Sequence, residues 1–203
     1  MNHGAPKLIL ASGSATRATM LRNAGLIFDV VPAAVDEDEM KRALRAEKAS
    51  GAQLAEALAE LKAQHVARKA PQAAMVIGAD QVLECGGQWF DKPQDVSAAR
   101  AQLLELRGKS HRLISSACVV RDGQVLWMRT EHATLLVRNF SDAFVDDYLA
   151  RVGDAVTRSV GAYQLEGIGA QLFARIDGDY FTILGLPLLP LLEFLRAHKR
   201  VLA

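Results

Sequence analysis

The stretch Lys7-Leu-Ile-Leu-Ala-Ser-Gly-Ser-Ala-Thr-Arg17 joins a short apolar run to a polar turn and the start of a helix. Residues 7–11 are bounded by turn residues, which is typical of a buried strand. From Ala15 onward, apolar residues recur at helical spacing, and Gly25 follows them as a stop signal. This segment therefore predicts a strand, a turn and a helix, as at the opening of an α/β protein.

Outward from this segment, the chain alternates signals for strands and helices. Residues 26–31 and 73–79 indicate two more strands, and we expect the second to end on Asp80. An Ala-rich helical region over 36–69 is expected to break at Gly51. Turn and cap signals indicate the remaining elements: a hairpin at 86–87, a helix after Asp95, a hairpin around 122–123, a helix after Ser141, a Gly-punctuated loop over 161–169, two strands about 177–178 and a helix after Pro187. This order predicts an α/β fold with a mixed β-sheet and flanking helices.

The composition excludes several classes of protein. The chain has 203 residues, of which 50% are hydrophobic, and its formal net charge is +1. That length suits one domain, or one domain divided into two lobes, and the apolar fraction excludes global disorder. Near-neutral charge argues against a binder of nucleic-acid polymers, and no apolar run is long enough to span a membrane. Cys85 and Cys118 cannot form a disulfide framework, and with no visible signal peptide they predict a cytoplasmic protein.

The turn between the first strand and the first helix is the first candidate site. Ser12, Ser14 and Arg17 lie where a helix N-terminus offers free N–H groups and a positive dipole end, which together attract phosphate. The alternative is that Ser14 only caps the helix and Arg17 is solvated. Spacing alone leaves both interpretations open.

Carboxylates supply the second group of candidates. Asp80 follows an apolar strand, and ligands gather at the carboxyl ends of strands in open α/β sheets, so it could hold a metal or orient water. The alternative is a turn or capping residue. The acidic run Asp36–Glu39 could ligate a hard cation, or it could only complement the dipole of a helix that begins there.

These segments together resemble the Maf family of nucleoside triphosphate pyrophosphatases. The matching motifs follow the family order from about Lys7 to Arg196, which is nearly the whole chain. They are Leu8-Ile-Leu-Ala-Ser-Gly-Ser14 with Arg17, Val35-Asp-Glu37, Leu61-Lys-Ala63, Ile77-Gly-Ala-Asp80, Asp91-Lys-Pro93, Gly161-Ala-Tyr163, Gly167-Ile-Gly169 and Gly185-Leu-Pro-Leu188. Each motif is weak alone, but the ordered set is specific.

The resemblance implies a fold and an activity. The expected fold is a single bilobed domain over residues 1–203, similar to inosine triphosphate pyrophosphatases, with a cleft between two lobes. The expected reaction is hydrolysis of the α–β phosphoanhydride of a small-molecule nucleotide, giving a nucleoside monophosphate and pyrophosphate with Mg²⁺ or Mn²⁺ as cofactor. The resemblance leaves open a homodimer, and it leaves a non-catalytic nucleotide-binding regulator of cell division as an alternative function.

The resemblance also implies roles for individual residues. Phosphate oxygens are expected to contact Ser12, Ser14 and Arg17. Four further candidates are expected to be catalytic. Glu37 and Asp80 would hold the metal and the water, with Asp80 as general base, and Lys62 and Lys92 would neutralise the triphosphate. This division fits phosphoryl chemistry, which needs positioning and charge neutralisation more than covalent catalysis.

Departures within the family motifs bear on the substrate. Gln81 and Glu166 are similar to the subgroup that acts on 7-methyl-GTP, whereas the subgroup that acts on dTTP and UTP usually has Thr and Gln there. A carboxylate at Glu166 could accept hydrogen bonds from guanine and offset the charge of the methylated ring. Against this, Thr16 stands where that subgroup tends to have an aromatic residue. We therefore expect 7-methyl-GTP as substrate, with dTTP or UTP as the alternative.

Overall fold

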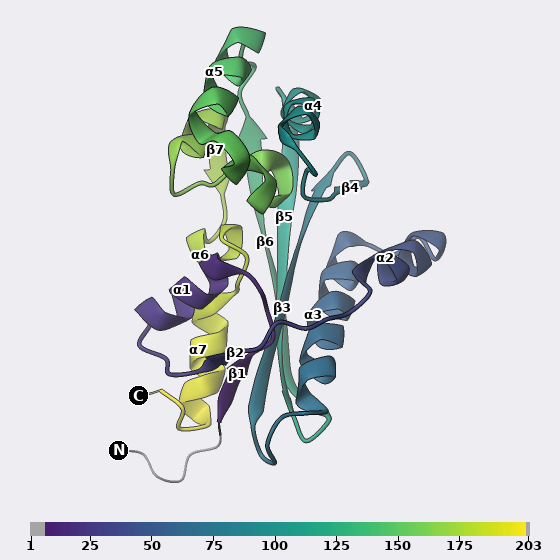
Figure 1. The fold of residues 1–203 in the computed structure, drawn as a ribbon, viewed down its shortest axis with the longest axis vertical. Coiled ribbons are helices and arrows are strands. Elements are labelled where there is room, and N and C mark those ends of the chain that lie inside the picture. Colours follow the sequence, from purple (N-terminus) through teal and green to yellow (C-terminus); the bar gives the residue numbers. More distant parts are fainter. Residues whose placement is uncertain (1–6, 202–203) are drawn as a thin grey trace. The chain divides into compact units, whose positions relative to one another are not determined.

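The computed structural model describes residues 7–201 and confirms a mixed α/β fold (Figure 1). The strands are β1 (Leu8–Leu10), β2 (Asp29–Val30), β3 (Met75–Cys85), β4 (Gln88–Phe90), β5 (Ser110–Arg121), β6 (Gln124–Val137) and β7 (Phe173–Asp177). The helices are α1 (Ala15–Asn23), α2 (Glu37–Ala46), α3 (Gly51–Ala67), α4 (Val96–Leu106), α5 (Asp142–Val152), α6 (Tyr180–Ile183) and α7 (Leu188–Ala197). Short 3₁₀ turns are η1 (Gly153–Arg158), η2 (Val160–Ala162) and η3 (Ile168–Leu172).

The strands form one seven-stranded sheet in the order β2-β1-β3-β5-β6-β7, and β4 pairs with β3. The sheet is mixed because β1 runs parallel to β2 and β3, while β4 and β7 run antiparallel to their partners. Among the helices of residues 7–201, none combines the length and the apolar character needed to cross a membrane.

The chain divides into two compact units. The first contains the residues up to Gln81, Ser115–Glu131 and the stretch from Tyr180 onward, and the second contains Val82–Ile114 and His132–Asp179. Residues 1–6 and 202–203 of the expected domain lie outside the described residues. Seven of the nine candidate site residues belong to the first unit.

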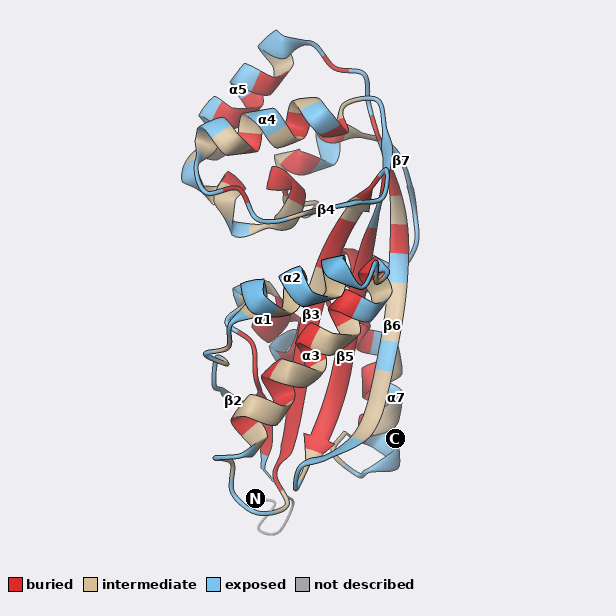
Figure 2. Ribbon diagram, turned by 90° about the vertical axis from the view of Figure 1, so that its right-hand side faces the viewer, coloured by how far each residue is buried: buried red, intermediate tan, exposed pale blue. Residues whose placement is uncertain are grey.

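In the first unit, strands β1, β3 and β5 are buried on both faces (Figure 2). On one face, α1 and α7 pack against the strands through residues such as Leu21 and Leu191, both fully buried. On the other face, α3 packs with small residues, chiefly Ala59 and Ala63, against Val76 and its neighbours. Strands buried on both faces are apolar along their length, which explains the continuous hydrophobic runs in the sequence.

A close approach at Gly78 brings α3 onto β3. A Cβ atom at position 78 would lie 2.0 Å from the carbonyl oxygen of Ala59 and 2.8 Å from the Cβ of Ala63. Because real Cβ atoms never come that close to backbone, only glycine allows this packing. The same packing carries Lys62, the residue before Ala63 on α3, to the strand that holds Asp80.

The second unit packs α4 against α5. Its core includes Leu103, Leu106 and Val145, each at most 1% exposed. Asp95 and Ser141 cap the two helices, as the sequence predicts, by accepting hydrogen bonds from the backbone N–H groups three residues on.

Two predicted strand boundaries and one predicted strand are wrong. Strand β3 does not end at Asp80 but continues to Cys85, because Val82 and Leu83 are buried and β4 pairs with its last residues. Strand β2 is limited to residues 29–30, and Ile27 before it is 94% exposed. The second strand expected after Gly178 is instead helix α6, whose last carbonyls accept hydrogen bonds from Gln81.

We predict that Gly78→Ala lowers the free energy of unfolding by about 3 kcal/mol, because the added methyl group must push α3 away from β3. Urea denaturation followed by circular dichroism measures the loss. Gly167→Ala is the control, since a Cβ there would meet only the carbonyl oxygen of Gln164 at 3.8 Å. Equal stability of the two variants would contradict the packing argument.

Candidate active site

The turn before α1 has the geometry of an anion-binding loop. Ser14 caps the helix by accepting a hydrogen bond from the backbone N–H of Arg17 at 3.3 Å. The Ser12 hydroxyl accepts from the backbone N–H of Ser14 at 3.3 Å and from Nη1 of Arg17 at 3.1 Å. Both hydroxyls act as acceptors here, so each O–H hydrogen remains available to donate to a phosphate oxygen.

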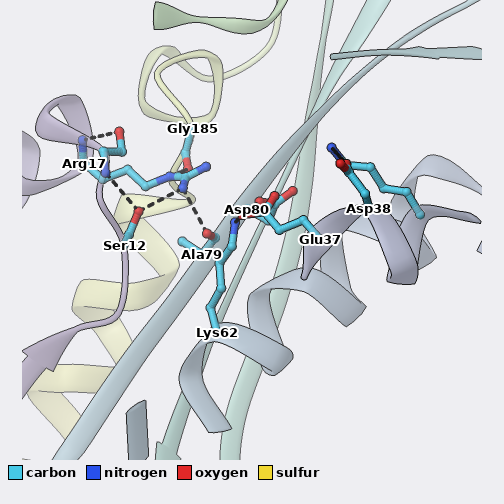
Figure 3. Close-up of polar contacts among 10 residues, drawn as sticks. Ser12, Arg17, Glu37, Asp38, Lys62, Ala79, Asp80 and Gly185 are labelled. Atoms are coloured by element: carbon cyan, nitrogen blue, oxygen red, sulfur yellow. Dashed lines mark hydrogen bonds and ion pairs between the residues drawn. The ribbon is translucent and has the colours of Figure 1, made fainter. Parts of the chain in front are cut away.

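Arg17 is buried and joins three parts of the first unit (Figure 3). Its Nε donates to the carbonyl of Gly185 at 2.7 Å, and its Nη1 donates to Ser12 and to the carbonyl of Ala79 at 2.9 Å. Burial lowers the pKa of the guanidinium below its usual value, and the negative charges of Asp80 and Glu37 oppose that shift. Arg17 is therefore not solvated, and these three hydrogen bonds use Nε and Nη1, so that Nη2 could donate to an anion.

On the other side of β3, Lys62 lies between two carboxylates (Figure 3). Its Nζ donates to Oδ1 of Asp80 at 2.6 Å and contacts Oε1 of Glu37 at 2.8 Å. Lys62 and Asp80 are 9% and 7% exposed, whereas the Glu37 side chain is 38% exposed. The trio carries one more negative than positive charge, so a further cation would be attracted to it.

The two carboxylates suit Mg²⁺ or Mn²⁺. Within residues 7–201, no three His, Cys, Asp or Glu side chains gather as a complete metal site. Mg²⁺ rarely needs one, since it usually takes one or two protein carboxylates and completes its shell with waters and substrate phosphates. Glu37 and Asp80 already converge on one cation, the Lys62 ammonium, and neither uses its second carboxylate oxygen in these ion pairs. The donor set therefore fits the expected cofactor.

Gln81 is held in one orientation. Its Nε2 donates to the hydroxyl of Ser115 at 3.1 Å and to the carbonyls of Thr182 and Ile183 at 3.1 and 3.0 Å. Because two of these partners are carbonyls, the nitrogen must face them, and the amide orientation is fixed. Oε1 is left as a hydrogen-bond acceptor. Gln81 thus also ties β3 to α6.

Lys92 and Glu166 belong to the second unit. Lys92 is exposed just before Pro93, in a segment whose Asp91 carbonyl accepts a hydrogen bond from Nε2 of Gln102 at 2.7 Å. Glu166 is exposed in the turn between η2 and η3. The structure thus brings together the other seven candidates, namely Ser12, Ser14, Arg17, Glu37, Lys62, Asp80 and Gln81. Their roles in the reaction stay predictions.

Several residues that shape this site are absent from the sequence-based predictions. Gly185 and Ala79 contribute only backbone carbonyls, and a carbonyl leaves no side-chain signature in a sequence. Ser115 is fully buried. Its hydroxyl accepts a hydrogen bond from Nε2 of Gln81 and donates one to the carbonyl of Thr182 at 2.8 Å. A polar residue inside the apolar strand 113–120 was the available signal.

The chain belongs to the Maf family, since the family model described as Maf-like protein matches residues 7–198. The resemblance deduced from the sequence motifs is therefore confirmed.

Curated relatives match almost over their full length. A nucleoside triphosphate pyrophosphatase of Paramagnetospirillum magneticum is 57% identical over 190 residues, which cover 94% of this chain and 97% of that protein. A protein of the same name from Granulibacter bethesdensis is 53% identical over 193 residues, covering 95% and 98%. A 7-methyl-GTP pyrophosphatase of Rhizobium meliloti is 50% identical over 191 residues, covering 94% and 96%.

We predict that Arg17→Lys lowers the free energy of unfolding by about 3 kcal/mol, because one ammonium cannot serve acceptors arranged around a planar guanidinium. Urea denaturation tests this. The matched control is Arg22→Lys on the same helix, where the side chain is exposed and a change below about 0.5 kcal/mol is expected. If Arg17→Lys were as stable as the control, the hydrogen bonds of Arg17 to Ser12, Ala79 and Gly185 would not stabilise the first unit.

Proposed function

We propose that this chain is a nucleoside triphosphate pyrophosphatase that hydrolyses the α–β phosphoanhydride of a modified purine nucleotide. One observation carries the proposal: a buried carboxylate, Asp80, shares a lysine with Glu37 directly beside the arginine and serine turn. A carboxylate that can orient water next to donors for phosphate is what this hydrolysis requires. The activities named for the curated relatives support the same conclusion.

The proposed reaction is an attack of water on the α-phosphorus. The new bond joins the water oxygen to phosphorus, and the bond between phosphorus and the bridging oxygen breaks, so that pyrophosphate leaves with that electron pair. Asp80, whose Oδ1 is held by Lys62, orients the water and accepts its proton. Ser12, Ser14 and Nη2 of Arg17 donate to the phosphate oxygens, and Lys62 and Lys92 supply positive charge.

A divalent cation belongs to this proposal. Mg²⁺ or Mn²⁺, held by Glu37 and Asp80, would neutralise phosphate charge and polarise the bond that breaks. Without a cation, the excess negative charge of Glu37, Asp80 and Lys62 would repel a triphosphate.

The orientation of Gln81 supports a guanine base. Its donor group is occupied by Ser115, Thr182 and Ile183, which leaves an acceptor. The Watson–Crick edge of guanine presents two neighbouring N–H donors, whereas thymine and uracil present one. Glu166, a second acceptor, has the same preference and would also offset the positive charge of 7-methylguanine.

We also propose the cytoplasm as the compartment. Both cysteines, Cys85 and Cys118, are free and buried, which suits a reducing environment. The homodimer expected from the resemblance stays a prediction.

We predict that Asp80→Asn lowers kcat by about a thousandfold, because the amide cannot accept the proton of the attacking water. Pyrophosphate release in the presence of Mg²⁺ or Mn²⁺ measures the rate, and inorganic phosphate is measured separately. Asp38→Asn is the matched control, since its side chain is 86% exposed and its ion pair with Lys41 is long, at 3.8 Å. Wild-type rates in Asp80→Asn would remove Asp80 as the general base.

We predict that kcat/KM for 7-methyl-GTP exceeds the values for dTTP and UTP by at least about tenfold, the selectivity typical of one or two well-placed hydrogen bonds. A panel of canonical and modified nucleoside triphosphates tests this, with products identified by type. Preference for dTTP or UTP would support the alternative substrate class. Binding of nucleotides with no pyrophosphate release would support a non-catalytic regulator of cell division instead.

A further inference from the structure

His111 and Tyr163 form a buried polar pair in the second unit that the proposed reaction does not use. His111 lies on β5 and is 1% exposed, and its Nε2 is 2.7 Å from the hydroxyl of Tyr163. Both rings also pack on Phe173, with centroid distances of 6.1 and 4.8 Å. Burying an imidazole and a phenol hydroxyl among aromatic rings costs free energy unless the two groups are hydrogen-bonded, so we ask what this pair does.

The pair is uncharged at neutral pH. Burial lowers the pKa of His111 to about 4 and raises the pKa of Tyr163 well above its usual value. A neutral imidazole has one donor and one acceptor nitrogen, and Nδ1 has no partner among the described residues. The single hydrogen bond to Tyr163 is therefore the imidazole's whole compensation for burial, which ties the ring to that tyrosine.

Tyr163 follows a backbone turn that L-residues rarely adopt. Gly161 and Ala162 are both buried with φ of 79° and 61°, in the left-handed region. A side chain at Gly161 would also meet Cδ1 of Leu83 at 2.6 Å. Ala162 keeps this conformation because its carbonyl accepts a hydrogen bond from the hydroxyl of Tyr148 at 3.0 Å. Strain of this kind persists only where surrounding contacts determine the conformation.

The strained turn leads directly into the loop with Glu166. Ser159 donates to the carbonyl of Tyr163, so that residue is held through its backbone as well as its hydroxyl. Beyond it, the N–H of Gly167 donates to the carbonyl of Gln164 at 3.2 Å, and Gly169 packs against the same residue. The loop that carries the exposed Glu166 and Gly167 therefore begins at a tethered residue.

We propose that His111 and Tyr163 are positioning residues for nucleotide selection: their hydrogen bond fixes the turn at Gly161–Ala162 and with it the backbone that presents Glu166. The selection part rests on the proposed function, in which Glu166 recognises the base. Neither residue touches the substrate in this scheme. The pair acts by keeping one loop conformation populated before binding, which raises selectivity for the base that fits it.

The test uses four variants of the full chain: Tyr163→Phe, His111→Phe, the double variant, and His111→Gln, which restores a hydrogen-bonding group. Tyr180→Phe is the control, because that tyrosine is 48% exposed. Amide hydrogen exchange of the peptide 159–169 reports the loop without requiring activity. Separate kcat and KM values for 7-methyl-GTP, GTP and dTTP report selection.

We expect exchange of the 159–169 peptide to rise about tenfold in Tyr163→Phe and His111→Phe, while α5 keeps its protection. Selectivity for the favoured nucleotide over the others should fall about tenfold, mainly through KM. The double variant should be no worse than either single variant, because both remove one hydrogen bond. His111→Gln should recover part of both effects.

Three results would overturn the proposal. The first is unchanged exchange in both single variants, and the second is raised exchange with unchanged selectivity. The third is additive loss in the double variant. If the wild-type chain hydrolysed none of the nucleotides, the proposed function would fail instead, and the exchange data would still decide whether the pair holds the loop.

Discussion

The missing side chain at Gly78 is the constraint on which the first unit depends. A helix can lie this close to a strand only where no Cβ intervenes, and the small residues Ala59 and Ala63 complete the contact. The approach sets the height of α3 above the sheet, and therefore the reach of Lys62 to Asp80. A polar contact of 2.6 Å at a buried position is thus a consequence of steric packing two residues away.

Strand β3 provides hydrogen-bond acceptors to two buried cations, Arg17 and Lys62. The carbonyl of Ala79 meets Arg17 on one face, whereas the side chain of Asp80 meets Lys62 on the other. Each buried charge has an opposite charge or several hydrogen-bond partners, as burial requires. The side chains of Asp80 and Gln81 serve opposite sides because successive side chains of an extended strand alternate between the faces of the sheet. The arrangement concentrates four charged groups within a chain whose net charge is +1.

The sequence predicted the helices well and the ends of strands less well. Asp95 and Ser141 cap helices through local hydrogen bonds, which sequence patterns record directly. The end of β3 was misplaced because a charged Asp80 resembles a strand terminus, whereas its lysine partner on α3 allows it to lie inside one. Ordered family motifs identified the seven residues that gather in the first unit. They could not indicate the three hydrogen bonds of Gln81 or the buried pair of His111 and Tyr163, because both depend on distant chain segments.

The hydrogen bond from Arg17 to Gly185 spans 168 residues of chain. During synthesis, which proceeds at about 5–20 residues per second, the arginine would emerge many seconds before its acceptor. Until then, the guanidinium of a nascent chain stays in water and the loop before α1 lacks its main brace. The turn before α1 thus gains this hydrogen bond only after α6 and Gly185 have been synthesised. A ribosome-bound or C-terminally truncated chain that ends before Gly185 would contain α3 and β3 but would leave Nε of Arg17 without this acceptor.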